Sequence, residues 1–422
     1  MIEPAEVDRA VGMECYASDF LPCPGSIKMM PEDFQVEEVP ADLGVASDPG
    51  DSSIPLYRVE KRGIDTLHME RRLGEALKSR VTTAGMKDKR SVAVQFATPT
   101  SRRGDAPELV DGEGFVARRV GFVRRPIGRG SIFGNRFRIL VRGATGELVG
   151  KAKETFGLAQ RSRIPNFYGL QRFGGRGNHT HLVGREIVKG RYSEAVERLL
   201  YEPRKGDSPS EAAARSDFKS QVEAGRVRGL PAGMDLERMA ASALSRKAGD
   251  YVAALRAVPI KVRRLYVQAY QSYLFNKTLS RALMHGLDIS KPEDGDNWGE
   301  TGTGGLALAK VHGVREPQAS GAVPLIQLPG YATRDYQSRF DRLLFEVMGE
   351  EDVSPREFYI KELQETSAEG GFRRPAMTVV EPSVSDSEMG VLLEFTLGRG
   401  NYATVLIREM VKPVDPVAAG FA

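Results

Sequence analysis

The sequence has the pattern of β-strands near both of its ends and the pattern of helices between them. Residues 34–36 and 56–60 alternate apolar and polar side chains with the period of two expected of half-buried strands. After Pro375 this pattern returns in two further expected strands, the first with Leu392, Glu394 and Phe395 and the second with Tyr402, Thr404 and Leu406. Because similar segments flank a different one, the sequence predicts a discontinuous β-rich domain, residues 1–165 and 376–422, interrupted by a helix-rich insertion over 166–375.

The insertion is expected to contain amphipathic helices and polar loops. A helix capped by Ser193 has the apolar stripe Val196, Leu199 and Leu200, and a longer helix ends near Gly286. The aromatic residues of the longer helix suit core packing better than base stacking; they are Tyr266, Tyr270, Tyr273 and Phe275. Two polar stretches, 202–217 and 288–303, are expected to be mobile surface loops.

The N-terminal part is expected to hold a helix and a further strand after residues 56–60. Asp65 and Thr66 can cap the helix, whose apolar face is expected to contain Leu73, Ala76 and Leu77. In the strand, the apolar side is expected to contain Val92, Val94 and Phe96, which alternate with Ala93, Gln95 and Ala97. Asp88 directly precedes this strand, so a rigid sheet can aim its carboxylate.

Asp88 is the candidate catalytic residue. It lies in a glycine-started turn, residues 84–91, where it is flanked by the cations Lys87, Lys89 and Arg90. Nearby positive charge favours the ionised carboxylate, so Asp88 is available near neutral pH as a nucleophile or base. The same three cations are candidates for contacts with an RNA backbone. The alternative is an ordinary solvated turn aspartate, since Asp is common in turns.

Composition favours a multidomain protein with local basic clusters. The 422 residues are 41% hydrophobic, which allows two or three domains with sizeable cores. The net charge is only +4, so a polyanion must be bound by clusters rather than by the overall field. Such clusters occur at 118–129, at Lys261 with Arg263 and Arg264, and at 373–374, with aromatic residues nearby. Solvated charged surfaces are the alternative interpretation.

Several classes of protein are disfavoured. The two cysteines, Cys15 and Cys23, are too few for a disulfide framework, which favours a reducing cytoplasm. No secretory leader or membrane-length apolar segment is recognisable, so no membrane partner is expected. The closest histidines, His179 and His181, lack a third ligand nearby, so no metal is expected. No phosphate-cradling or dinucleotide-binding motif is convincing, so no cofactor is expected.

Six segments, in order, resemble the motifs of the TruD family of tRNA pseudouridine synthases. They span nearly the whole chain, which makes the combined resemblance specific. They are KMMPEDFQVEE (28–38), LYRVEKRG (56–63) with Thr66, AGMKDKRSVAVQ (84–95), GNRF (134–137), PNFYGLQRFG (165–174) and LGRGNYATVLIRE (397–409). The length of the insertion and the segment 324–331 are similar to the archaeal branch.

This resemblance implies an α/β (α+β) fold, in which a catalytic core with a mixed or antiparallel sheet carries an inserted helix-rich α/β domain called the TRUD domain. It implies an isomerase that converts a D-arm uridine of tRNA, typically uridine 13, to pseudouridine without a cofactor or an obligatory protein partner. Asp88 corresponds to the nucleophile and Lys28 to its basic partner. The residues that correspond to base or pocket contacts are Phe34, Asn135, Phe137 and Tyr402.

Each implied contact has an ordinary structural alternative. Lys28 could be a surface lysine at a strand edge, Phe34 a core phenylalanine and Asn135 a turn residue after Gly134. Two other functions also remain open. A non-catalytic RNA-binding or RNA-folding protein would lack uridine isomerisation. A metal-dependent RNA hydrolase built on Asp33 and Asp88 would be silenced by EDTA.

Overall fold

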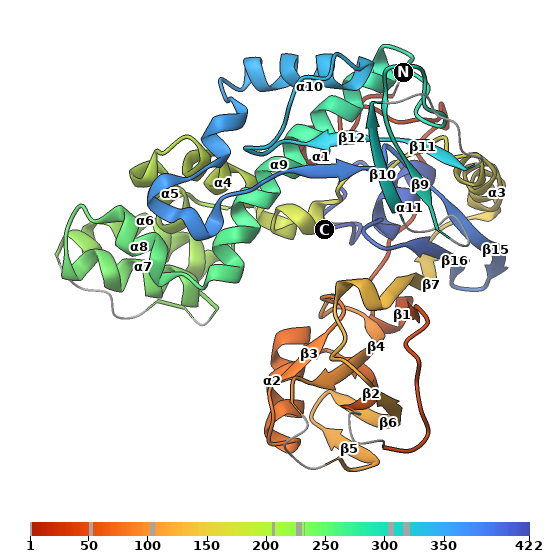
Figure 1. Ribbon diagram of the computed structural model, residues 1–422, viewed down its shortest axis with the longest axis horizontal. Helices are drawn as coiled ribbons and strands as arrows, with labels where there is room; N and C mark the ends of the chain where they lie inside the picture. The colour runs from red at the N-terminus through yellow and green to blue at the C-terminus, as the bar shows by residue number, and fades with distance from the viewer. Residues whose placement is uncertain are drawn as a thin grey trace.

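The computed structural model describes residues 2–49, 54–101, 106–204, 207–224, 230–231, 233–302, 308–314 and 321–422 (Figure 1). Within these ranges, nine strands form one mixed sheet, in the order β15-β16-β7-β1-β4-β2-β6-β5 with β3 beside β4. The β1–β4 pair is parallel and its neighbours in the sheet are antiparallel. The strands are β1 (Phe34–Pro40), β2 (Ile54–Arg62), β3 (Val81–Thr83), β4 (Val92–Pro99), β5 (Leu109–Gly112), β6 (Phe115–Val123), β7 (Ile132–Arg142), β15 (Val379–Ser387) and β16 (Gly390–Gly398).

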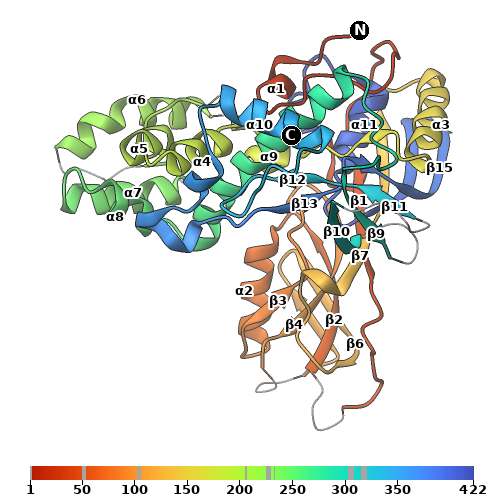
Figure 2. The ribbon, with the colours of Figure 1, turned by 45° about the horizontal axis from the view of Figure 1, so that its top comes forward.

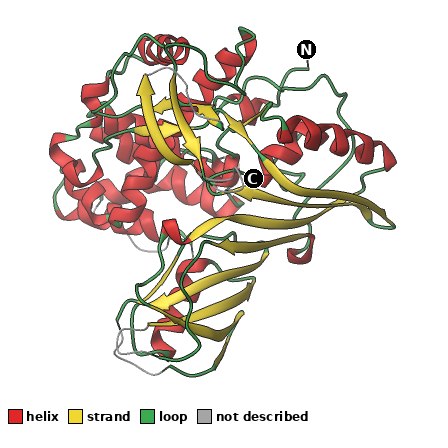
Figure 3. Cartoon of the chain, turned by 45° about the vertical axis from the view of Figure 1, so that its right-hand side comes forward, coloured by secondary structure: helices red, strands yellow, loops and turns green. Residues whose placement is uncertain are grey.

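The sheet joins the two ends of the chain. Strand β16, from the C-terminal part, pairs with β7, and β7 pairs with β1 near the N-terminus. The mixed α/β architecture and the strands expected at 34–36, 56–60 and 392–395 are therefore confirmed. Figure 3 shows the strands continuing from the body of the molecule into a smaller lobe.

Helices cover the two halves of the sheet separately. α3 (Gly146–Gln160) packs against β15 and β16, where the rings of Phe156 and Phe395 lie 5.6 Å apart, and α11 (Ala403–Val411) packs against α3. α2 (Thr66–Ala76) covers β2, β4 and β6 in the smaller lobe, which projects from the body in both views (Figures 1 and 2). Asp65 caps α2 as expected, accepting a 3.0 Å hydrogen bond from His68 N. Leu73 and Leu77 are buried with Met69, but Ala76 is exposed.

Two strand predictions are wrong in informative ways. The stretch with Tyr402, Thr404 and Leu406 forms helix α11, not a strand. All nine residues of α11 are buried, including the polar residues Thr404, Arg408 and Glu409, so the helix has no exposed polar side and its spacing does not identify a period. In β4, the buried side contains Ala93, Gln95 and Ala97, whereas Val92, Val94 and Phe96 are only half-buried. α2 packs over the side with the smaller residues, and Thr66 Oγ1 donates a 3.3 Å hydrogen bond to Gln95 Oε1 there.

The helix-rich region packs around one long helix. α9 (Ile260–Met284) confirms the expected long helix, and it contributes side chains both to the helical cluster and to the core beneath the sheet. Tyr266, Tyr270 and Phe275 are buried, as expected of packing residues. α4 lies against α9 at Gly184, where a Cβ atom would approach Tyr266 O to 2.0 Å. The surrounding helices are α4 (Thr180–Val188), α5 (Tyr192–Leu200), α7 (Asp235–Arg246), α8 (Tyr251–Ala257) and α10 (Arg339–Glu350).

Three details of this region differ from expectation. Helix α5 begins at Tyr192, so Ser193 is not its cap, although Val196, Leu199 and Leu200 are buried as expected. The stretch 202–217 includes the first turns of α6 (Pro209–Glu223), and the stretch 288–303 contains β9 (Asn297–Thr301), so neither is simply a loop.

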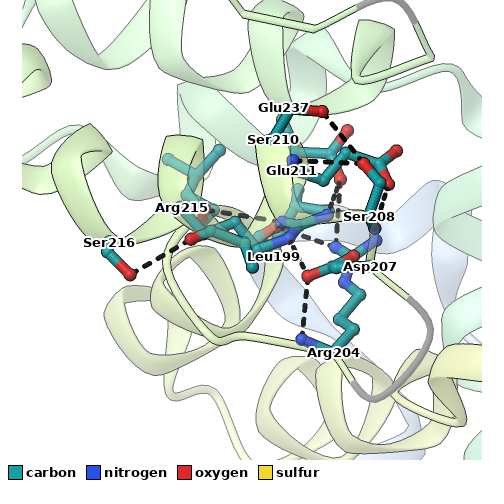
Figure 4. Close-up of polar contacts among 11 residues, drawn as sticks. Leu199, Arg204, Asp207, Ser208, Ser210, Glu211, Arg215, Ser216 and Glu237 are labelled. Carbon is teal, nitrogen blue, oxygen red and sulfur yellow. Dashed lines mark hydrogen bonds and ion pairs between the residues drawn. The ribbon is translucent and has the colours of Figure 1, made fainter.

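Buried ion pairs explain why so polar a stretch folds at α6. Arg215 is 2% exposed and donates hydrogen bonds of 2.9 Å to both Asp207 and Glu237 (Figure 4). Its third donor contacts Leu199 O at 3.0 Å. Ser208 caps the helix by accepting from Glu211 N. The polar residues of this stretch therefore satisfy one another inside the protein, a pairing that composition does not reveal.

The region leaves and re-enters the sheet domain at adjacent points. β8 (Ile164–Pro165) pairs with β14 (Ala376–Met377). The remaining small sheets are formed by β9 with β10 (Leu308–Val314) and β11 (Ala322–Pro324), and by β12 (Ile326–Leu328) with β13 (Gly371–Arg373). Across the described ranges, none of the helices has the length and apolar character needed to cross a bilayer.

Candidate functional site

A cavity of about 730 Å³ lies where β1, β7, the turn before β4 and the start of α11 meet. Segments that are far apart in the sequence thus form one site. Its lining includes all six residues predicted for catalysis and base contact, namely Lys28, Phe34, Asp88, Asn135, Phe137 and Tyr402. It also includes Gln171 and Thr404, which the sequence analysis did not select.

Asp88 is held by an ion pair with Lys28. Lys28 Nζ donates a 2.8 Å hydrogen bond to Asp88 Oδ2, and the backbone N–H of Arg90 donates one of 3.0 Å to Oδ1. The Lys28 side chain is 3% exposed, whereas that of Asp88 is 34% exposed and faces the cavity. Burial alone would raise the pKa of Asp88, but the charge and hydrogen bond of Lys28 lower it below its ordinary value. The carboxylate is therefore ionised and partly accessible.

The backbone at Lys28 is unusual. Its φ of 56° lies in the left-handed region, which is rare for a residue other than glycine. The neighbouring Ile27 is fixed by a 2.9 Å hydrogen bond from its N–H to Ala419 O. Residues in such conformations persist where the surrounding structure holds them, and they concentrate at functional sites.

Lys61 anchors the turn that carries Asp88 through hydrogen bonds to backbone carbonyl groups. It is fully buried, and its ammonium group donates to the carbonyl oxygens of Ile64 at 2.8 Å, Asp88 at 2.9 Å and Lys87 at 3.3 Å. Burial lowers the pKa of Lys61 to about 8, although Asp88 and Asp65 raise it. The sequence analysis gave Lys61 no role. A signal was present, because Lys61 follows the buried Tyr57 and Val59 at the spacing of one strand face.

Two hydroxyl groups complete the anchoring of this turn. The N–H of Lys87 donates to Thr66 Oγ1 at 2.9 Å, and Ser91 Oγ donates to Asp88 O at 2.8 Å. The turn that carries Asp88 is thus fixed by side chains from β2, α2 and its own end.

The sequence analysis expected Lys87 to contact an RNA backbone, but its ammonium group is engaged within the protein. Its side chain is 7% exposed, and its ammonium group lies 3.0 Å from Glu38 Oε1 and donates to Asn135 Oδ1 at 2.5 Å. A lysine in a polar turn can point inward when a buried carboxylate faces it, so this engagement argues against the expected RNA contact. Lys89 and Arg90 are exposed beside the cavity, which leaves them accessible to a ligand.

Aromatic side chains form two walls of the cavity. The rings of Phe34 and Phe137 lie 5.9 Å apart in an edge-to-face arrangement, with Lys28 Nζ 5.0 Å from the Phe34 ring. On the other wall, Tyr402 contacts Tyr168 edge-on at 6.0 Å, and the Arg373 guanidinium stacks 4.0 Å from the Tyr168 ring. Thr404 donates to Gln171 Oε1 at 3.1 Å on this second wall. The motif at 165–174 therefore contributes Gln171 to the cavity lining, and this polar side chain within a largely aromatic and apolar motif was a signal that could have indicated it.

The basic cluster at the start of α9 is divided. Arg263 is buried, and its guanidinium pairs with Glu365 and donates to Val258 O at 2.9 Å. It is therefore committed to the protein and is not available to a phosphate, contrary to expectation. Lys261 and Arg264 are exposed. Lys261 also lines a second cavity of about 510 Å³ with residues of α2 and β3.

The other residues considered earlier lie in structural positions. Burial lowers the pKa of both His179 and His181 to about 3, and His181 stacks on Tyr273 at 5.1 Å. Asp33 is buried and bonded to Arg142 through a 2.7 Å ion pair, so its carboxylate is engaged away from the cavity lining. In the part of the chain that the structure describes, no group of three or more His, Cys, Asp or Glu side chains is arranged to hold a metal ion.

Known proteins resemble this chain over nearly all of its length. The family profile described as tRNA pseudouridine synthase D (TruD) matches residues 10–410. A protein of Pyrobaculum arsenaticum, named "Probable tRNA pseudouridine synthase D", is 33% identical, with all of both chains covered. One of the same name from Methanopyrus kandleri is 34% identical over 84% of this chain and 85% of its own. A crystal structure of a TruD protein from Methanosarcina mazei matches with a TM-score of 0.76 at 27% identity, covering 98% of this chain and 99% of that one. The chain therefore belongs to the tRNA pseudouridine synthase D (TruD) family.

Proposed function

We propose that this protein converts a uridine of tRNA to pseudouridine, that the target is uridine 13 of the D arm, and that Asp88 is the nucleophile. The observation that carries the proposal is the ionised Asp88 carboxylate at the cavity surface, backed by the buried Lys28 ammonium group. The ion pair keeps the carboxylate charged, and the Lys61 and Ser91 hydrogen bonds to its backbone carbonyl limit its movement.

The reaction needs no additional reagent. The N1–C1′ bond of the uridine breaks, the detached uracil turns, and a C5–C1′ bond forms. The hydrogen on C5 is lost and N1 gains one, so substrate and product have the same formula. Asp88 can support this chemistry by attacking either the ribose or the base. Both routes require a flipped-out nucleotide and a pocket that retains the free base.

The cavity suits a flipped nucleotide. Its volume of about 730 Å³ lies within the usual range of ligand pockets. Phe34 and Tyr402 on its walls offer ring faces or edges to a base, an interaction worth about 1–3 kcal/mol in nucleic-acid complexes. Phe137 packs edge-to-face against Phe34 and also lines the cavity.

The exposed cations around the cavity are suited to holding the tRNA backbone. Lys89 and Arg90 lie at the rim, and Lys261 faces α2 across the second cavity. We assign residues 1–165 and 376–422 to the catalytic domain and 166–375 to the inserted TRUD domain. The pairing of β8 with β14 at the two junctions supports this division. A tRNA substrate also supports a cytoplasmic location. The isomerisation itself requires no cofactor.

The test is incubation of purified protein with unmodified tRNA transcripts, followed by mass-spectrometric mapping of pseudouridine. The wild type is expected to modify the D-arm uridine in the presence of EDTA. Asp88→Asn, which is nearly isosteric but lacks the anionic oxygen, is expected to bind tRNA within about threefold of wild type and to form no product. Wild-type turnover by Asp88→Asn would reject the nucleophile assignment. Tight tRNA binding by a wild type that forms no pseudouridine would instead indicate a non-catalytic RNA-binding protein.

A further inference from the structure

The Asn135 side chain is held in one orientation by a buried ion pair. Lys87 Nζ donates to Asn135 Oδ1 at 2.5 Å and lies 3.0 Å from Glu38 Oε1. The Glu38 side chain is fully buried, and its other oxygen accepts from Phe96 N at 2.8 Å. Glu38 and Asn135 are also directly paired residues of β1 and β7, so their side chains lie on the same face of the sheet.

The chemistry of Lys87 determines which end of the amide is free. A lysine ammonium group has three donors and no acceptor, so only the oxygen of Asn135 can face it. The Asn135 NH₂ group must then point elsewhere, and Asn135 lines the same cavity as Asp88. Within the described part of the chain, no hydrogen bond of Asn135 Nδ2 to protein is formed. The cavity therefore contains a fixed hydrogen-bond donor.

We propose that the Glu38–Lys87 ion pair makes Asn135 an obligatory donor that meets O4 of the bound uridine before the base rotates, and that this donor excludes cytosine. This inference rests on the proposed function, because it concerns the base that the site isomerises. The base contact of Asn135 is already implied by the family resemblance, and the new element is that Lys87 and Glu38 are positioning residues that act through Asn135.

A fixed hydrogen-bond donor suits a base that must rotate by half a turn during the reaction. When uracil rotates by half a turn about the line through N3 and C6, N1 exchanges places with C5 and O4 exchanges places with O2. A donor that meets one carbonyl oxygen before the rotation therefore meets the other one after it. A free asparagine could present either its donor or its acceptor, but the locked amide presents a donor to both orientations of uracil.

Cytosine does not match this donor in both orientations. It carries an amino group in place of O4, so binding in the orientation that precedes rotation places two donors against each other and leaves both unsatisfied. Specificity of this kind comes from a penalty against the wrong ligand as well as from an attraction to the right one. The penalty requires that Asn135 cannot rotate, which the buried ion pair ensures.

The experiment compares two tRNA transcripts that differ only at the mapped target position, one with uridine and one with cytidine. Dissociation constants are measured for wild type, Asn135→Asp and the double variant Lys87→Met/Glu38→Gln. The double variant removes both charges together, because either charge alone would be left buried without a partner. Lys153→Met, a change at an exposed lysine of α3, serves as the matched control.

Wild type and Lys153→Met are expected to bind the uridine transcript at least about tenfold more tightly than the cytidine transcript. Asn135→Asp presents an acceptor to the cavity and is expected to reduce this ratio about tenfold, with tighter binding of the cytidine transcript. The double variant is expected to reduce the ratio several-fold, because Asn135 can then rotate. Unchanged ratios in both folded variants would overturn the inference.

A second measurement does not depend on cytidine. Sulfur is a weak hydrogen-bond acceptor, so a transcript with 4-thiouridine at the target should react more slowly than the uridine transcript with wild type. This difference should shrink in Asn135→Ala, and a difference that is equal in both proteins would contradict the donor role. The ratios of dissociation constants do not depend on turnover. A wild-type protein that forms no pseudouridine would therefore reject the proposed function, while the ratios would still test the role of Asn135.

Discussion

Lys28 Nζ and Asp88 Oδ2, which belong to residues 60 positions apart in the chain, are joined by a 2.8 Å hydrogen bond at the surface of the main cavity. The lysine is the more buried partner, with 3% of its side chain exposed against 34% for the aspartate. The reactive group thus remains accessible while its counter-charge is shielded from water and salt, which strengthens the interaction between them.

Lys28→Met is expected to shift the acid limb of the activity profile to higher pH. Lys28 opposes burial and holds the pKa of Asp88 below its ordinary value, so its removal allows burial to raise that pKa. The carboxylate is active only when ionised, and activity should therefore be lost at a higher pH than in wild type. Single-turnover rates between pH 4 and 8 would measure the shift. An unchanged acid limb would show that Lys28 does not control this ionisation.

Lys61→Met is expected to lower kcat about 10- to 100-fold while KM changes little, because the turn that aims Asp88 is no longer held by three hydrogen bonds. The pKa of Lys61, lowered by burial to about 8, adds a second readout. In wild type, a rise in pH through about 8 removes its proton and weakens the anchor, so the rate should fall there. This alkaline limb should be missing from Lys61→Met. Retention of the same limb would assign it to another group.

Tyr402→Phe is expected to keep near-wild-type activity, whereas Tyr402→Ala should lower kcat/KM about 5- to 150-fold. The Tyr402 ring packs edge-on against Tyr168 and lines the cavity, and its removal abolishes a stacking interaction worth about 1–3 kcal/mol. Phe34→Leu should show a decrease in the same direction, since it keeps apolar volume but removes the ring. Equal kinetics for Tyr402→Ala and wild type would make this ring a packing element only.

The double variant Lys261→Ala/Arg264→Ala and the single variant Arg263→Ala are expected to fail in different ways. Replacing the exposed pair should reduce the salt slope of tRNA binding by about one for each phosphate that is no longer neutralised. Arg263→Ala should leave the slope unchanged and destabilise the protein by about 1–3 kcal/mol, because it leaves Glu365 and Val258 O without their partner. Binding at several salt concentrations and thermal unfolding would separate the two effects. An identical slope for the double variant would remove Lys261 and Arg264 from the RNA interface.

The sequence by itself predicted the features that depend on local order. The strands at 34–36, 56–60 and 392–395 and the long helix before Gly286 each follow from periodicity within a single segment, whereas the α/β class is implied by the family resemblance. The six ordered motifs also predicted the family. Periodicity failed at residues 402–406, where every residue of the helix is buried, and in β4, where the larger side chains face away from α2. In both places neighbouring elements decided the outcome.

Only the tertiary structure decided which charged residues face the cavity and which are bonded within the protein. Lys87, Lys89 and Arg90 are equivalent in the sequence as cations beside Asp88, yet only Lys87 turns inward, because Glu38 lies buried opposite it. Arg263 and Arg264 are adjacent in the sequence, yet Glu365 takes the side chain of Arg263 into the interior. The free energy of burying a charge depends on whether a partner from a distant segment meets it. The sequence determined the chemical groups available to this site, and the long-range pairing of charges determined which of them can reach a substrate.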